Sequence, residues 1–244
     1  MIAVRASKSR WLVVGLVLVL VSLGWLTSNQ RHHEKLPAIA KPTKTDVVFT
    51  APRPGRDVSW RIFAGFDLPV SATAGPHCLS ETRAACFAHT PDGAAMAAAQ
   101  ILVRTFPFAG SSTFGPSIAE QVTGPGAPAL ARLTQQTYEQ AASQQALQAG
   151  APIHTTDGWI AGYRLDHDTD PTGPTARLDV LVMGTGESPG FTSYDVELVW
   201  RNGDWRLVAP DWGDWRNNAH PVRNPYPASY RRYDDIGLGT GGAS

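Results

Sequence analysis

The feature that most constrains the fold of this chain is an uncharged run near its amino terminus, Trp11–Thr27. A helix of these seventeen residues, at about 1.5 Å of rise per residue, nearly crosses a hydrocarbon core roughly 30 Å thick. The rest of the chain contains enough polar residues to fold in water. The run therefore predicts one transmembrane helix over residues 11–28 that carries one water-soluble domain.

The charges beside the run predict its orientation. Three basic residues precede it within residues 1–10, whereas Arg31 and Lys35 follow it and are partly offset by Glu34. The positive-inside rule places the more basic flank in the cytoplasm. We therefore expect a cell-membrane protein with a single span, a cytoplasmic amino terminus and an extracytoplasmic carboxyl-terminal domain.

A cleaved signal peptide is the alternative interpretation, because it also combines a basic start with an apolar middle. Ser22-Leu23-Gly24 has the small-x-small pattern of a cleavage site. The apolar run continues through Trp25 and Leu26, which favours a retained anchor. The sequence leaves both interpretations open.

Composition divides the rest of the chain. Residues 29–57 hold four prolines and no apolar period, which predicts an extended linker. Residues 58–215 have the length of one folded domain, and residues 216–244 are expected to be a disordered tail. All the acidic residues lie beyond residue 28, so this part is slightly acidic. No nucleic-acid partner is expected for it.

The chain contains two cysteines, Cys78 and Cys86. In an oxidising compartment such a pair is expected to form one disulfide, which would close a small loop around Leu79–Ala85. A zinc site would need His77 and His89 as further ligands, and the spacing of the two cysteines is not that of a zinc finger.

The clearest helix start lies at Thr90, which is a suitable cap and is followed by a proline at the first helical position. We expect this helix to extend to about Phe106. Its polar residues Asp92, Gln100 and Arg104 share one stripe at i, i+4 spacing, and the remaining faces are alanine or large aliphatics. The pattern predicts a core helix that is wrapped by a sheet.

After this helix, the spacing of apolar residues changes along the chain from a helical period to the alternation that is typical of strands. A short helix is expected at Ser117–Val122 and a longer helix at Ala127–Gln148. Three alternating strands follow, centred on residues 159–166, 177–182 and 194–200. Asn202-Gly203 then predicts a two-residue type I′ hairpin turn. In that register, three pairs face each other: Arg201 with Asp204, Trp200 with Trp205, and Leu198 with Leu207.

Helices followed by a meander of antiparallel strands define the α+β class. The order helix, short helix, helix and strand meander resembles the nuclear-transport-factor-2-like (NTF2-like) fold, also called the cystatin-like cone or roll. The resemblance implies helices packed on a curved antiparallel sheet.

Spaced motifs run through the first half of the domain: Trp60, Gly65, Leu68-Pro69, Gly75-Pro76 and Phe87-Ala88-His89-Thr90-Pro91-x-Gly93-Ala94-Ala95. With the aromatic strand end at Val196–Trp205, they resemble a family of uncharacterised actinobacterial single-pass proteins found near conjugative and integrative-element transfer genes. Those proteins are similar to bitopic assembly components of type IV secretion systems. This chain departs from the pattern at Cys86, where a glycine is expected.

Two groups of residues invite a chemical interpretation. His89 lies beside the helix start, where packing near the cap is the alternative to catalysis. Asp166-His167-Asp168-Thr169-Asp170 offers hard oxygen ligands suited to weak calcium binding, but a solvated loop at a strand end is favoured. We expect no metal and no cofactor, because none of the nucleotide, zinc-protease or hydrolase motifs occurs.

The expected function is therefore non-enzymatic: a membrane-anchored envelope or scaffold protein that binds protein partners. The resemblance implies a conjugation component or accessory that forms homo-oligomers or contacts other secretion components. Trp212 and Trp215 form a possible partner-binding patch, with packing at the open end of the sheet as the alternative. The other hypotheses are a small-ligand or cell-wall binding module and an NTF2-like enzyme, whose candidate residues are His89, His154, Asp157 and His167.

Overall fold

A computed structural model of the chain describes residues 57–153, 158–167, 169–170, 173–184, 190–223 and 230–237. The helix predicted over residues 11–28, and all but the last residue of the predicted linker, lie outside these ranges. Within the described residues, no helix is both long enough and apolar enough to span a bilayer.

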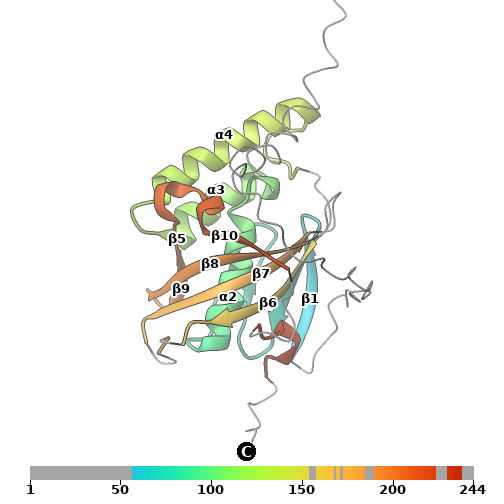
Figure 1. Cartoon of the computed structure of the whole chain (residues 1–244). Coiled ribbons are helices and arrows are strands. Elements are labelled where there is room, and N and C mark those ends of the chain that lie inside the picture. Colours follow the sequence, from blue (N-terminus) through green and yellow to red (C-terminus); the bar gives the residue numbers. More distant parts are fainter. Residues whose placement is uncertain are drawn as a thin grey trace, which may run out of the picture. The chain divides into compact units, whose positions relative to one another are not determined.

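The described residues form a mixed, mostly antiparallel sheet (Figure 1). Its strands follow the order β1-β2-β6-β7-β8-β9-β5, and β10 pairs with the free part of β8. The pairs β2–β6 and β5–β9 are parallel. The strand bounds are β1 (Val58–Phe63), β2 (Phe66–Ser71), β5 (Val122–Thr123), β6 (Gly158–Leu165), β7 (Thr175–Gly184), β8 (Gly190–Arg201), β9 (Asp204–Val208) and β10 (Ala219–Val222).

Helix α2 (Pro91–Arg104) packs on one face of this sheet, against β2, β7 and β9 (Figure 1). The predicted cap is confirmed, since the Thr90 hydroxyl accepts a 3.0 Å hydrogen bond from the Gly93 amide. Every residue from Gly93 to Arg104 is buried. The prediction of a core helix is therefore confirmed. Of its polar stripe, Gln100 and Arg104 are buried together with the apolar faces, and Asp92 is half-buried.

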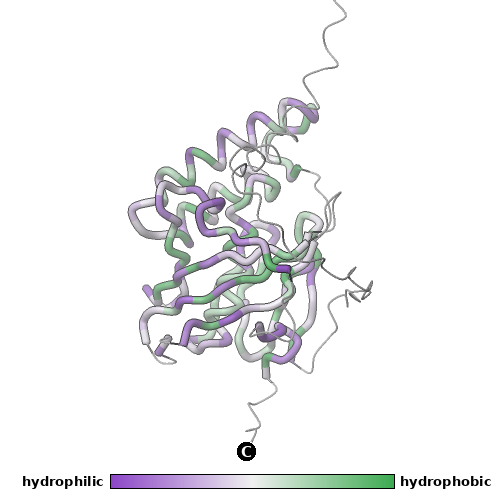
Figure 2. Tube along the Cα trace, in the orientation of Figure 1, coloured by the Kyte–Doolittle hydropathy of each residue, from purple (hydrophilic) through white to green (hydrophobic). Residues whose placement is uncertain are grey.

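Helices α3 (Ser111–Gln121) and α4 (Ala127–Gln145) pack against each other. Helix α3 begins six residues before the predicted start, whereas α4 ends at Gln145, three residues before the predicted end, and is capped by Ala146 in a left-handed conformation. Figure 2 shows α4 as an alternation of hydrophilic and apolar turns, and it buries one narrow stripe centred on Leu130 and Tyr138.

Two-residue turns with positive φ close the β1–β2 and β8–β9 hairpins. At Asn202-Gly203 the φ values are 55° and 79°, and all three predicted cross-strand pairs between β8 and β9 are present. A second turn of this kind, Ala64-Gly65, joins β1 to β2. The sequence did not predict this turn, because alanine rarely adopts positive φ.

The range 216–244, expected to be disordered, contributes ordered elements where it is described. Strand β10 pairs with β8, and Arg231 forms a backbone bridge with Tyr163 of β6. Tyr233 and Ile236 are fully buried in the core. Gly237 then lies against Asp57, since a Cβ added at Gly237 would be 2.7 Å from the Asp57 Cβ. The folded domain therefore extends beyond the predicted boundary at residue 215.

Candidate functional site

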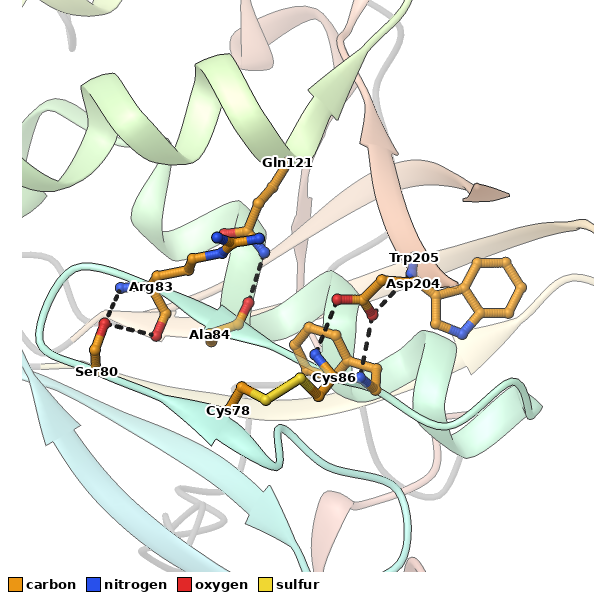
Figure 3. The surroundings of a disulfide bond; sticks show 9 residues. Cys78, Ser80, Arg83, Ala84, Cys86, Gln121, Asp204 and Trp205 are labelled. Carbon is orange, nitrogen blue, oxygen red and sulfur yellow. Dashed lines mark hydrogen bonds between the residues drawn. A yellow bond between two sulfur atoms is a disulfide. The ribbon is translucent and has the colours of Figure 1, made fainter. Parts of the chain in front are cut away.

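The predicted disulfide between Cys78 and Cys86 is confirmed (Figure 3). It closes a small hairpin of β3 (Cys78–Leu79) and β4 (Ala84–Ala85), which stands apart from the main sheet. Because both sulfur atoms are in this bond, neither is a free thiolate for the zinc alternative.

Side chains from two distant elements fasten this disulfide loop to the domain (Figure 3). The Asp204 carboxylate, at the start of β9, accepts hydrogen bonds from the backbone amides of Cys86 and Phe87 at 2.9 and 3.1 Å. The Gln121 amide, at the end of α3, donates a 2.6 Å hydrogen bond to the Ala84 carbonyl. The loop is therefore held in one place relative to α2 and α3.

A cleft of about 650 Å³ lies between this loop and the β1–β2 hairpin. Residues 79–82 of the loop and residues 61–64 of the hairpin contribute to its walls. Ser112 and Thr113 line it from the start of α3, and α2 contributes Gln100 and Arg104. The volume is within the range of roughly 300–1,000 Å³ that is typical of small-molecule sites.

The most unusual side chain in this cleft is Arg104, which is only 3% exposed. Its Nη1 donates to the Gln100 carbonyl at 3.0 Å and to Gln100 Oε1 at 2.5 Å. Its Nε is sealed from solvent and has no hydrogen-bond acceptor. Among the described residues no carboxylate pairs with this guanidinium. Burial lowers the pKa of Arg104 to about 10, so it remains a cation at neutral pH.

Two neighbours fix the Arg104 guanidinium in position. The Phe63 ring lies 4.3 Å from its central carbon, in a cation–π contact. Gln100 ties it to the sheet, because the Gln100 Nε2 donates a 2.6 Å hydrogen bond to the Pro69 carbonyl of β2. The sequence placed Gln100 and Arg104 on one helical stripe but gave no sign that this stripe faces a cleft.

The rim of the cleft is partly apolar. Ile62 is 82% exposed and Leu79 is 40% exposed, and together with Trp212 they are the large hydrophobic side chains exposed within the described residues. Arg61 and Glu81 add one charge of each sign to the rim. The cleft therefore combines a buried cation with apolar side chains at its opening.

The structure separates the two tryptophans of the predicted patch. Trp212 is 84% exposed and has a left-handed backbone, with φ of 62°, in the short helix η2 (Asp211–Gly213). Trp215 is buried, and its indole nitrogen donates a 3.1 Å hydrogen bond to the Thr105 hydroxyl. Only Trp212 is exposed for contact with a partner.

Of the residues of the enzyme hypothesis, His89 and His167 are described, and neither lines the Arg104 cleft. The His89 ring stacks on Trp200 with a centroid distance of 4.1 Å, and its Nε2 lies 3.1 Å from the Gly173 carbonyl oxygen. His167 lines another depression on the outer face of the sheet. His154, Asp157 and Asp168 lie outside the described residues.

This outer depression, of about 600 Å³, carries a row of charges across three strands. Arg164 of β6 pairs with Asp179 of β7, which faces Asp195 of β8. Burial raises the pKa of Asp179, and so does a hydrogen bond that protonated Asp179 donates to the Asp195 carboxylate, although Arg164 opposes this effect. Among the described residues, no group of three or more His, Cys, Asp and Glu side chains is arranged to hold a metal ion.

These features define an α+β domain in which a curled sheet surrounds one core helix and a disulfide-bonded loop borders a cleft. Residues 27–225 match the family described as Domain of unknown function (DUF8175), and the chain belongs to this family. No curated protein and no solved structure shows significant similarity to the chain.

Proposed function

We propose that this chain is a non-enzymatic, single-pass envelope protein whose extracytoplasmic domain binds protein partners. The observation that carries the proposal is the Cys78–Cys86 disulfide, in which both cysteines are exposed. Exposed structural disulfides are typical of oxidising compartments outside the cytoplasm. This location agrees with the orientation expected from the charges that flank the apolar run Trp11–Thr27.

Exposed apolar side chains support binding to a partner. Trp212 is exposed, so burial in the core does not stabilise it. Its left-handed backbone conformation also costs a residue with a side chain about 1 kcal/mol or more of conformational free energy. Large aromatic residues are enriched where proteins bind one another. Ile62, at the tip of the β1–β2 hairpin, supplies a second exposed apolar side chain.

The finer classification is also part of this proposal. A curled sheet around the buried α2, with α3 and α4 after it, supports the NTF2-like or cystatin-like roll. The proposed role in conjugation, with partners from a type IV secretion-like assembly or further copies of the chain, depends on the family resemblance of the motifs. The alternative of a small-ligand module is favoured by one specific observation, the buried cation Arg104 in the cleft.

Site-specific photocrosslinking in the native membrane tests partner binding. A photoreactive amino acid would replace Ile62 or Trp212 in the full-length chain, and Gln136, an exposed residue of α4, would serve as the control position. We expect crosslinks to a second copy or to other envelope proteins from Ile62 and Trp212, and few from Gln136. Equal yields from all three positions, or a chain that remains an uncrosslinked monomer, would contradict the proposal.

A further inference from the structure

We propose that the cleft beside the disulfide loop binds a monocarboxylate carried on an apolar body, and that the guanidinium of Arg104 holds the carboxylate through Nη2. This site goes beyond the proposed function, because it depends neither on a membrane anchor nor on a protein partner. It is carried by the side chains of Arg104, Gln100 and Phe63 and by the shape and lining of the cleft.

The first argument concerns the unpaired charge. A buried cation is strongly disfavoured unless an anion or a full set of hydrogen bonds compensates it. Arg104 is nine-tenths or more buried, and within the described part of the chain it has neither a carboxylate partner nor an acceptor for its Nε. A bound anion would supply the missing counter-charge.

The second argument identifies the free donor of the guanidinium. Nη1 is occupied by its two hydrogen bonds to Gln100. Nη2 has no acceptor among the described residues and, unlike Nε, is not sealed from solvent. A charge-assisted hydrogen bond from Nη2 to a carboxylate oxygen is one of the stronger kinds of hydrogen bond. The residue therefore presents one free, charged donor to the cleft.

The third argument concerns preorganisation. Phe63 covers one face of the guanidinium, and Gln100 connects it to the Pro69 carbonyl of β2. A cation that is already held in one orientation loses little conformational entropy when a ligand binds. The disulfide loop, fastened by Asp204 and Gln121, similarly fixes one wall of the cleft.

The lining of the cleft selects the class of ligand. Ile62, Leu79 and Phe63 offer apolar contacts, so the body of the ligand is apolar. The cleft holds two arginines, Arg61 and Arg104, and one acid, Glu81, which suits a single negative charge better than a phosphate dianion. A free acid of medium length and the carboxyl terminus of a polypeptide share this chemistry.

Binding measurements on the full-length chain in phosphatidylcholine nanodiscs would test the site. The probes are octanoate and the dipeptide N-acetyl-Leu-Leu with a free carboxyl terminus, each compared with its neutral amide by calorimetry, with empty nanodiscs as the blank. We expect saturable binding of at least one acid and affinity about 10- to 100-fold weaker for its amide. The acid that binds identifies the source of the carboxylate.

Three variants connect the binding to Arg104. Arg104→Met keeps much of the side-chain volume and should lose about 10- to 100-fold in affinity while its melting temperature stays equal or rises. Arg104→Lys keeps the charge without the planar fork and should show an intermediate loss. Arg61→Met, at the exposed rim, is the matched control and should bind nearly as the unmodified chain does.

Several results would overturn the proposal. The comparison of acid with amide on the unmodified chain needs no variant, and equal affinity for the two, or no saturable binding of either acid, excludes a carboxylate site. Unchanged acid binding by a folded Arg104→Met variant would exclude Arg104 as the binding group. Trp212 does not line this cleft, so photocrosslinking from Trp212 is independent of these outcomes and the two proposals fail separately.

Discussion

At the residue scale, the domain keeps two ionisable groups in places where burial opposes their charge. Arg104 is a cation inside the cleft, and Asp179 is a partly buried acid on the outer face of the sheet. Their pKa values move in opposite directions, that of Arg104 down and that of Asp179 up, because in both cases burial favours the neutral form. For each group, the charged form therefore contributes less to the stability of the fold than the neutral form would.

Asp179 makes the pH dependence of stability testable. Because its folded-state pKa is raised above its unfolded value, its contribution is full below the unfolded pKa and is lost as pH rises through the folded pKa. We expect Asp179→Asn to gain stability relative to the unmodified chain as pH rises from about 4 towards neutrality. Urea unfolding of both chains across this range is the measurement.

Asp214 supplies a control, because its contribution to stability changes with pH in the opposite direction. Hydrogen bonds from Arg216 hold the pKa of Asp214 below its ordinary value, so its contribution is lost as pH falls through the folded pKa. Asp214→Asn should therefore differ from the unmodified chain above about pH 4 and approach it in stronger acid, with a small amplitude because the Arg216 side chain is exposed. A constant effect of Asp179→Asn at every pH would show that its charge has no influence on stability.

At the scale of elements, the disulfide loop is short and depends on contacts from other parts of the chain. Its bond spans eight positions of sequence, and Asp204 and Gln121 fasten it from β9 and α3. The loop therefore orders one wall of the cleft in addition to constraining the unfolded chain.

Removing this disulfide should lower the free energy of unfolding by about 2–3 kcal/mol, the loop-closure value for a bridge of this size. The paired variant Cys78→Ser with Cys86→Ser, compared with the unmodified oxidised chain by urea unfolding, measures the effect. Reducing agent should destabilise the oxidised chain by the same amount and leave the paired variant unchanged. A change below about 0.5 kcal/mol would show that contacts with Asp204 and Gln121 alone order the loop.

Sequence patterns predicted those elements whose signals are local. The cap at Thr90 and the turn at Asn202-Gly203 each depend on a few adjacent residues, and both were found as predicted. The turn at Ala64-Gly65 was not predicted, because an alanine gives no sign of positive φ. The helix predicted at Ser117 was too short at its start, because Gly115 and Pro116 resemble a break in a helix.

The cleft could not be predicted for a different reason. Its residues come from five segments, and only the folded sheet brings the β1–β2 hairpin and the disulfide loop to the same end of α2. Gln100 and Arg104 were identified as a polar stripe, but a stripe on a helix does not reveal whether water or a protein cavity faces it. A polar pair within an otherwise apolar helix was the available signal.

At the scale of the whole molecule, the segment 230–237 completes the core. Tyr233 is fully buried, contacts the Tyr163 ring, and donates a 3.0 Å hydrogen bond to the Ala95 carbonyl of α2. Trp60 of β1 donates to the Asp234 carboxylate at 2.9 Å. The end of the folded chain thus connects the first strand, the central helix and β6.

Tyr233→Ala should lower the free energy of unfolding by about 3–5 kcal/mol, because it leaves a large cavity in the core. Tyr233→Phe keeps the ring and removes only the hydroxyl, so it should cost about 1 kcal/mol. Urea unfolding of both variants separates the two contributions. If Tyr233→Ala lowered the free energy by less than about 1 kcal/mol, the segment would add little to the stability of the core.

Gly237 lies in contact with Asp57, so the last and the first residues that the structure describes are neighbours. Since these two points almost touch, the order in which the described elements follow one another is nearly circular. A short linker between these points, with new ends opened at the exposed turn Asn202-Gly203, would give a rearranged chain that keeps every strand pair of the sheet and breaks only the connection between β8 and β9. We therefore expect the architecture of this domain to be independent of where its polypeptide begins.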